Sequence, residues 1–178
     1  MSHESHVSSQ LLAALDQGRR LLESIDEELY TRSPTPIATS TVGEHFRHVL
    51  DGLVCLLDGI ETGSIDYDRR ARDEAVETRP AVALAQVRGL AARVRGLEGN
   101  GSVRVRADVP EELGADAGWN DSTVDREVLF GLSHTIHHFA LIAMILRFLG
   151  GEPPEGFGVA PSTLRYWKEV GRCAPVAG

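Results

Sequence analysis

The sequence predicts an all-α protein built as a four-helix bundle, and three observations support this fold class. Four stretches of the chain repeat apolar residues at alternating spacings of three and four, the pattern of a helix that packs lengthwise on its neighbours. Segments rich in proline or glycine separate these stretches. With 178 residues, of which 42% are hydrophobic, the chain can bury one core, so we expect a single domain over residues 1–178.

The first two helices are predicted on either side of a long crossing. The apolar repeat places the first helix over residues 6–31. The next segment, SPTPIATS, cannot continue that helix because proline lacks the backbone N–H group that a helix interior needs. Thr41 and Glu44 then have the spacing of a capping box, so we expect the second helix over residues 41–61.

The third helix is predicted between a charged linker and a short β-hairpin. Residues 61–80 form the expected linker, and Pro80 suits the first turn of the helix that follows. The sequence GNG at residues 99–101 ends this helix. In SVRVRADV, residues 102–109, valines alternate with arginines, and a period of two is typical of a half-exposed strand. We therefore expect a small hairpin between the third and fourth helices.

The fourth helix has the longest apolar stripe of the chain. Asp121 or Ser122 is its expected N-cap, because a short polar side chain can accept a hydrogen bond from the free backbone N–H groups of the first turn. The helix is expected to end at Gly150 and the glycine that follows it. Farther on, Ser162 is expected to cap a short C-terminal helix.

The charge pattern argues against a nucleic-acid partner. The formal net charge is -8, and the densest basic cluster, Arg69, Arg70 and Arg72, is interleaved with Asp68 and Asp73. Binding to a phosphate backbone depends on a sustained basic surface, which this pattern does not provide. We therefore expect no nucleic-acid partner.

The N-terminal segment, the lengths of the apolar stretches and the cysteines lead us to expect a cytoplasmic protein without a membrane partner. The N-terminal segment MSHESHVSSQ lacks the basic flank and apolar run of a signal peptide. No later apolar stretch is expected to reach the roughly 18 to 20 residues that span a bilayer. The two cysteines, Cys55 and Cys173, form no CxxC motif and are too few for a disulfide framework, which fits a reducing compartment.

The histidines are the main candidates for chemistry, and the segment GLSHTIHHF places three of the seven inside an apolar helix. At about 100° per residue, His134 and His138 lie about 40° apart and one turn from each other, whereas His137 points away. Such a pair can supply two ligands to a metal ion, although histidines at a helix boundary can also simply bond to backbone or water. In the second helix, GEHFRHVLD offers His45 and His48 as a third ligand, and the helical wheel does not choose between them.

Four other polar residues near these histidines have simpler structural interpretations. Glu44 is the capping partner of the second helix, Asp51 is expected to be a solvated surface acid, and Cys55 a small buried side chain. Glu127 precedes His134 by two turns, about 10 Å along the helix, so it can act at most from outside the metal ligands or on a substrate.

The two histidine segments, TVGEHFRHVLDG and SHTIHHFALI, together resemble the DinB-like superfamily, whose members are four-helix bundles that bind a divalent metal ion through three histidines. In that family a histidine lies seven residues after the threonine of the first motif, and H-x-x-H-H lies on the last helix of the bundle. Counted from Thr41, the resemblance implies His48, His134 and His138 as metal ligands and His137 as a non-ligand. Zinc or nickel is the preferred divalent metal ion, with iron or manganese as alternatives.

The resemblance also implies an activity on a small-molecule substrate. Characterised relatives include metal-dependent enzymes that use a low-molecular-weight thiol, so we expect a thiol S-transferase or, if the metal activates water, a hydrolase. No serine, cysteine or carboxylate is placed as a nucleophile or general base, and the catalytic residues stay unassigned. The alternative is a non-catalytic metal-binding module with a structural, sensing or ligand-binding role.

A homodimer is expected from apolar residues that lie outside the predicted core stripes. Val54 in the second helix and Ala140 and Met144 in the fourth would leave apolar surface exposed on an isolated bundle. Pairing of two copies about a two-fold axis is the commonest way to cover such a surface.

Overall fold

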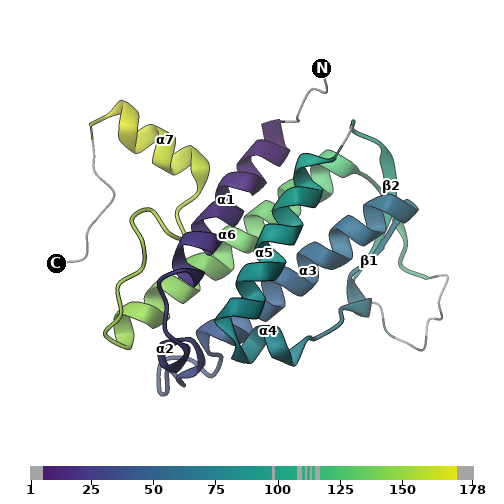
Figure 1. The fold of residues 1–178 in the computed structure, drawn as a ribbon. Coiled ribbons are helices and arrows are strands. Elements are labelled where there is room, and N and C mark those ends of the chain that lie inside the picture. Colours follow the sequence, from purple (N-terminus) through teal and green to yellow (C-terminus); the bar gives the residue numbers. More distant parts are fainter. Residues whose placement is uncertain are drawn as a thin grey trace.

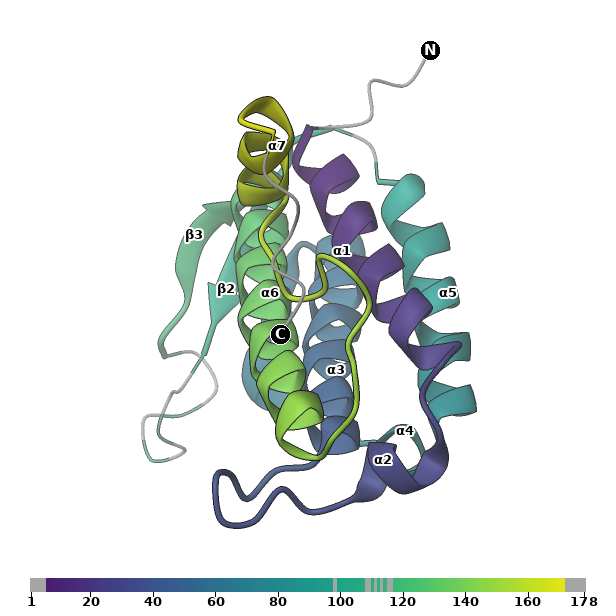
Figure 2. The same ribbon diagram turned by 90° about the vertical axis from the view of Figure 1, so that its left-hand side faces the viewer.

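The computed structural model describes residues 6–97, 99–107, 110, 112, 114 and 117–171. These residues are mostly helical, as the sequence predicts. Four long helices lie side by side (Figure 1): α1 (His6–Leu22), α3 (Val42–Thr62), α5 (Pro80–Arg95) and α6 (Val124–Phe148). Both α1 and α3 pack against α5 and against α6, so the four helices surround a shared interior. Figure 2 shows the same four helices side by side after a turn of 90°.

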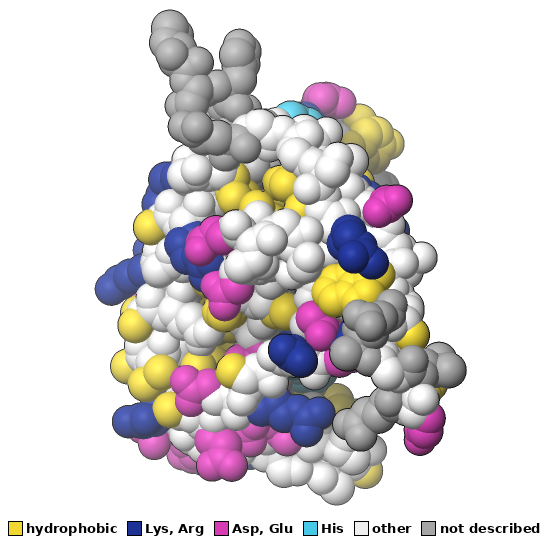
Figure 3. Space-filling view, turned by 90° about the vertical axis from the view of Figure 1, so that its right-hand side faces the viewer, with side chains coloured by type: hydrophobic (Ala, Val, Ile, Leu, Met, Phe, Trp, Pro, Cys, Tyr) yellow, Lys and Arg dark blue, Asp and Glu magenta, His cyan; other side chains and the backbone are white. Residues whose placement is uncertain are grey.

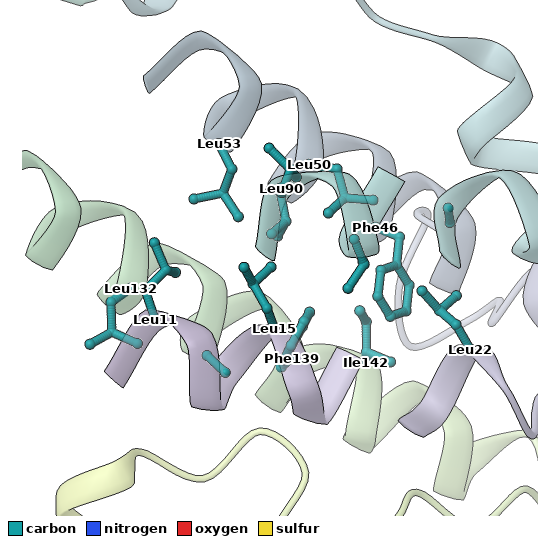
Figure 4. Close-up of a cluster of buried hydrophobic side chains, with 14 of the residues drawn as sticks. Leu11, Leu15, Leu22, Phe46, Leu50, Leu53, Leu90, Leu132, Phe139 and Ile142 are labelled. Carbon is teal, nitrogen blue, oxygen red and sulfur yellow. The ribbon is translucent and has the colours of Figure 1, made fainter. Parts of the chain in front are cut away.

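The apolar sides of the four helices meet in one hydrophobic core (Figure 4). Phe46 of α3 and Phe139 of α6 are fully buried, and their ring centroids lie 5.5 Å apart. Gly18 of α1 lies against the same rings, and a Cβ atom there would come within 2.8 Å of Phe139. The missing side chain at Gly18 therefore lets α1 approach α6 closely, which explains a glycine within the apolar stripe.

The first predicted helix, over residues 6–31, is wrong in one respect, because the chain forms two helices there. After α1 ends, α2 (Glu27–Thr31) starts with Asp26 as its N-cap. The Asp26 carboxylate accepts a hydrogen bond from the backbone N–H of Leu29 at 2.7 Å. Aspartate favours helix caps over helix interiors, so this bond starts a second helix where the apolar repeat suggested one continuous helix.

The second predicted helix is confirmed as α3, and its capping box is formed as expected. The Thr41 hydroxyl accepts a hydrogen bond from the Glu44 N–H at 3.1 Å, and the Glu44 carboxylate accepts one from the Thr41 N–H at 2.6 Å. Gly43 lies in the same turn, where an added Cβ would approach the Glu77 carbonyl oxygen to 1.9 Å. The capping box and this close approach fix the start of the helix that carries His45 and His48.

The charged linker predicted over residues 61–80 is in fact structured. It contains β1 (Ser64–Asp66), the 3-10 helix η1 (Tyr67–Arg69) and α4 (Glu74–Thr78). Ile65 of β1 is fully buried and packs on Gly59 of α3, where a Cβ would lie 2.6 Å from the isoleucine. The close contact between α3 and β1 fixes the position of the segment that follows.

The strands form a three-stranded sheet rather than the single hairpin predicted. β2 (Ser102–Arg106) lies in the segment where a strand was expected, and it pairs antiparallel with β3 (Asn120–Thr123). On its other side β2 pairs in parallel with β1, with Ile65 opposite Val105. The linker and the segment after α5 are therefore joined by backbone hydrogen bonds, an interaction that a local sequence pattern does not indicate.

The ends of the last two helices also differ from prediction. α6 starts after Thr123, whose hydroxyl accepts a hydrogen bond from the Arg126 N–H at 3.4 Å. Asp121 and Ser122, the predicted caps, belong to β3 and are therefore not available to the helix. The C-terminal helix is present as α7 (Pro161–Glu169), but it starts with proline in its first turn and has no side-chain cap from Ser162.

Among the described helices, α6 is long and apolar enough to cross a membrane by length and composition. The expectation that no stretch reaches this length is therefore wrong. The apolar composition of α6 has a ready explanation in the fold, because α6 packs against both α1 and α3 and contributes buried residues along its whole length. The absence of a membrane partner stays a prediction.

Charged side chains of both signs are mixed on the face of the molecule shown in Figure 3. Many arginines of the described residues are paired with acids: Arg93 lies 2.7 Å from Asp58, and Arg106 lies 3.2 Å from Asp66. The pairing continues the interleaving of charges seen in the sequence.

Candidate metal centre

The packing of α3 against α6 brings the predicted ligand residues together. His48 lies in the second turn of α3, and His134 and His138 lie one turn apart in the middle of α6. Gly131, one turn before His134, makes the close helix contact possible, because a Cβ there would lie 3.0 Å from Leu56 and 3.1 Å from Leu53. Cluster formation therefore depends on a small residue at the helix interface.

The three rings converge on one point through their Nε2 atoms. Nε2 of His134 lies 3.1 Å from Nε2 of His48 and 3.1 Å from Nε2 of His138. A divalent ion bound by nitrogen at about 2.0–2.1 Å, with angles between the octahedral and tetrahedral values, separates its ligands by about 2.8–3.4 Å. The three histidines could therefore hold one metal ion, since their ligand atoms all lie within 4.8 Å of one another.

Hydrogen bonding between the rings does not account for this convergence. A neutral imidazole nitrogen has either one proton or one lone pair in the plane of the ring. Nε2 of His134 can therefore make a hydrogen bond with His48 or with His138, but not with both at once. A cation at the shared point would satisfy all three nitrogens together.

The protonation state of the cluster suits a metal ion. Burial, together with a smaller contribution from the neighbouring His134 ring, lowers the pKa of His48 to about 4 and that of His138 to about 3. Burial also lowers the pKa of His134. The three rings are therefore neutral at physiological pH, which is the form that binds metal ions.

His45, the alternative third ligand in the sequence, takes a different position. Its Nδ1 lies 2.9 Å from Nδ1 of His138, the ring nitrogen opposite to the one that faces His134. A partner of this kind orients a metal ligand through the nitrogen that the metal does not use. His137 is exposed, and its ring meets the His138 ring edge-on at 5.3 Å between centroids. His48 is therefore the histidine of α3 whose Nε2 meets Nε2 of His134 on α6.

A cavity of about 200 Å³ lies directly beside the cluster, lined in part by His48 and His134. Apolar side chains of α3 and α6 form much of its wall, among them Leu53, Leu56 and Phe130. The rings of Phe130 and His134 stack, with their centroids 6.0 Å apart and their planes at 7° to each other. This stack extends the apolar wall to the histidine cluster. A small molecule in the cavity would therefore lie next to the converging nitrogens.

The polar part of the cavity wall comes from the segment after α3, where Tyr67, Asp68 and Arg70 lie. The sequence does not identify these residues as site residues, because the long, charged segment over residues 61–80 predicts only a linker. Its fixed position depends on β1, which pairs with a strand near residue 104, far along the chain. No local motif signals this proximity.

Glu127 supports this polar wall from behind. Its side chain is 1% exposed, and its carboxylate accepts hydrogen bonds from Tyr67 Oη at 3.2 Å, Ser122 Oγ at 2.6 Å and Arg126 Nη1 at 2.8 Å. Burial and the nearby Glu127 charge raise the pKa of Tyr67, which stays a hydrogen-bond donor. Glu127 thus holds a cavity residue in place, the outer role that its spacing predicted.

Asp51 and Cys55 both differ from simple surface or core residues. Asp51 is 4% exposed and lies 3.8 Å from Arg47, so the expected solvated acid is wrong. Cys55 is half-buried, and its thiol donates a hydrogen bond to the Asp66 carbonyl at 2.9 Å. Burial raises the pKa of Cys55 to about 11, so this residue is not a thiolate at neutral pH.

The fold and the site together define a helical protein with a three-histidine cluster that could bind a metal ion beside a small cavity. A family model, the DinB superfamily, matches residues 10–142, which include all three histidines and more than half of the chain. The chain therefore belongs to the DinB superfamily, as its two histidine motifs indicated.

One curated protein is also similar. The chain is 30% identical over 112 residues to FK506-binding protein 5 of Rhizopus delemar. The match covers 59% of this chain but 28% of the fungal protein, so the chain spans little more than a quarter of that relative.

Proposed function

We propose that His48, His134 and His138 bind one divalent metal ion through Nε2, within a four-helix bundle of the DinB type, and that the chain is a metal-dependent enzyme. The single observation that carries this proposal is the convergence of three neutral Nε2 atoms at the side of a cavity of about 200 Å³. Three protein ligands leave coordination positions for a substrate or water, which distinguishes catalytic from closed structural sites. Zinc or nickel is preferred, with iron or manganese as alternatives.

The proposed reaction is the transfer of a low-molecular-weight thiol to a small molecule, or a hydrolysis. The bound metal would supply a Lewis acid that lowers the pKa of a thiol or of water. The chain itself would orient the site: His45 holds His138 through Nδ1, and Phe130 stacks on His134. The apolar side chains of the cavity would limit access of bulk water to the reacting group.

A non-catalytic metal-binding module is the second candidate. In that case the ion would have four protein ligands and no exchangeable position, as structural zinc sites do. His45 is the candidate for a fourth ligand among the described histidines. Its Nδ1, however, contacts Nδ1 of His138, the ring nitrogen that does not face His134. The cavity at His48 and His134 favours the enzyme.

Metal analysis of purified variants tests the ligand set. The wild type is expected to hold one equivalent of metal, and His48→Ala, His134→Ala and His138→Ala are expected to lose most of it. His137→Ala is the matched control, because His137 lies on the same helix and is exposed. Circular dichroism would show that the variants are folded. Undiminished metal in all three ligand variants would contradict the proposal.

A panel of thiols and electrophiles, assayed with metal-loaded protein, tests the enzymatic part. Activity that disappears on chelation and returns when metal is added back is the expected result. If a purified activity survives complete removal of the metal, the metal-centred reaction is wrong.

A further inference from the structure

Arg70 is a cation at the edge of the proposed site. It follows η1 and lines the same cavity as His48 and His134. Its side chain is partly buried, and the ion pairs and hydrogen bonds of the described residues include none to its guanidinium group. Arg70 therefore shares this cavity with two of the proposed ligands, and no ion pair of the described residues neutralises its charge.

Three other arginines of the described residues, by contrast, are matched by acids. Arg69 lies 3.5 Å from Asp66, Arg126 lies 2.8 Å from Glu127, and Arg47 lies 2.7 Å from Glu77. Glu127 is also directed away from the cavity contents, because it already accepts three hydrogen bonds behind Tyr67. Asp68 is the other charged residue of the cavity wall, but its side chain is exposed, so solvent and salt screen its charge more strongly.

The surroundings of Arg70 favour recognition of a carboxylate. Much of the cavity wall is apolar, and a charged hydrogen bond gains strength where water is displaced from such a wall. The planar guanidinium group can donate two parallel hydrogen bonds to one carboxylate. The cavity of about 200 Å³ also limits the occupant to a small molecule.

We propose that Arg70 binds an anionic carboxylate of the small molecule that enters this cavity, so that the site selects a short acid over its neutral or cationic analogue. The proposal deepens the proposed function and rests on it, because the occupant is taken to be the thiol or substrate that reaches the metal. Arg70 is then a specificity-determining residue whose place is fixed by the β1 segment rather than by the helices that carry the histidines.

The test measures binding with a readout other than turnover. Cobalt-loaded protein would be titrated with 3-mercaptopropionate, 3-mercapto-1-propanol and 2-aminoethanethiol, and the change in its visible absorption would give each dissociation constant. We expect the acid to bind about tenfold more tightly than the alcohol, as one charge-assisted hydrogen-bonded pair provides. Arg70→Gln should remove this preference. Arg69→Gln, whose side chain is 81% exposed in the wild type, should keep it.

A second titration separates this proposal from the metal proposal. Metal-free protein would be titrated with hexanoate and with 1-hexanol, followed by the shift in melting temperature, in the wild type and in Arg70→Gln. Binding of hexanoate that depends on Arg70 would support the inference, whether or not cobalt and the thiols bind. Failure of cobalt or the thiols to bind would overturn only the proposed function. Equal binding of acid and alcohol in both titrations, tighter binding of the amine, or an unchanged preference in Arg70→Gln would overturn the inference.

Discussion

Replacing His45 with phenylalanine should weaken metal binding although no proposed ligand is removed. Nδ1 of His45 lies 2.9 Å from Nδ1 of His138, while Nε2 of His138 faces the cluster. Burial lowers the pKa of His45, so its ring is neutral and can accept the proton that His138 carries on Nδ1 when Nε2 binds a metal ion. Phenylalanine keeps the volume of the ring and removes the acceptor.

The expected loss of metal affinity in His45→Phe follows from the number of contacts that change. The ligand atoms of His48, His134 and His138 all stay, and one orienting hydrogen bond is lost. Loss of such a partner typically weakens metal binding by about 10–100-fold, which corresponds to about 1.4–2.7 kcal/mol. His138→Ala should cost more because it removes the ligand itself. His45→Gln should lie between the wild type and His45→Phe, since its amide oxygen can accept the same proton.

Competition between the protein and a chelator of known affinity for cobalt or zinc would measure these differences. His137→Ala is the control, because His137 also touches the His138 ring but lies on the exposed side of α6. Wild-type affinity in His45→Phe would show that His45 does not orient His138. An affinity as low as that of His138→Ala would instead indicate that His45 is a ligand, and the assignment of roles would be wrong.

Three further predictions concern other parts of the molecule. Phe139→Ala should lower the free energy of unfolding by about 3–5 kcal/mol, because the ring is fully buried between neighbouring aromatic side chains; an unchanged midpoint in urea would contradict this. Burial raises the pKa of Cys55 to about 11, so in a Cys173→Ser background its alkylation should be slow at neutral pH and accelerate as the pH rises toward that value. Fast alkylation at neutral pH would refute the buried thiol. A homodimer through α6 is expected to dissociate on Met144→Glu, since this methionine is 62% exposed. A wild-type mass near the 19.3 kDa of one chain in light scattering would exclude the dimer.

Features set by neighbours in the chain could be predicted from the sequence. The start of α3 depends on the bonds between Thr41 and Glu44, three residues apart, and it lies where the capping box predicted. The pairing of His134 with His138 likewise follows from the helical repeat alone. The choice of His48 over His45 does not, because both can face α6, and the ring nitrogens that actually meet depend on how the two helices pack.

Features set by distant parts of the chain were missed. β1 has three residues, and its parallel partner in β2 lies far away in the sequence, so its charged surroundings suggested only a linker. Tyr67 and Arg70 are cavity residues as a consequence of that pairing. The break before α2 had a local signal, the cap at Asp26, but the apolar repeat continues across it and obscured it. Asp51 is buried through contacts with the segment around α4, which the apolar pattern of α3 does not reveal.

Because β1 pairs with β2, the proposed metal ligands and the proposed specificity residue Arg70 lie on different parts of the chain. The histidines stand on α3 and α6, whose packing also stabilises the core, so most changes near them would disturb folding as well. Arg70 lies on a short segment that the edge strand holds, and its side chain is not part of that core. We therefore expect substitutions there to alter which molecule the proposed site accepts while the histidine cluster stays intact. Directed evolution of the proposed site should therefore begin at this segment.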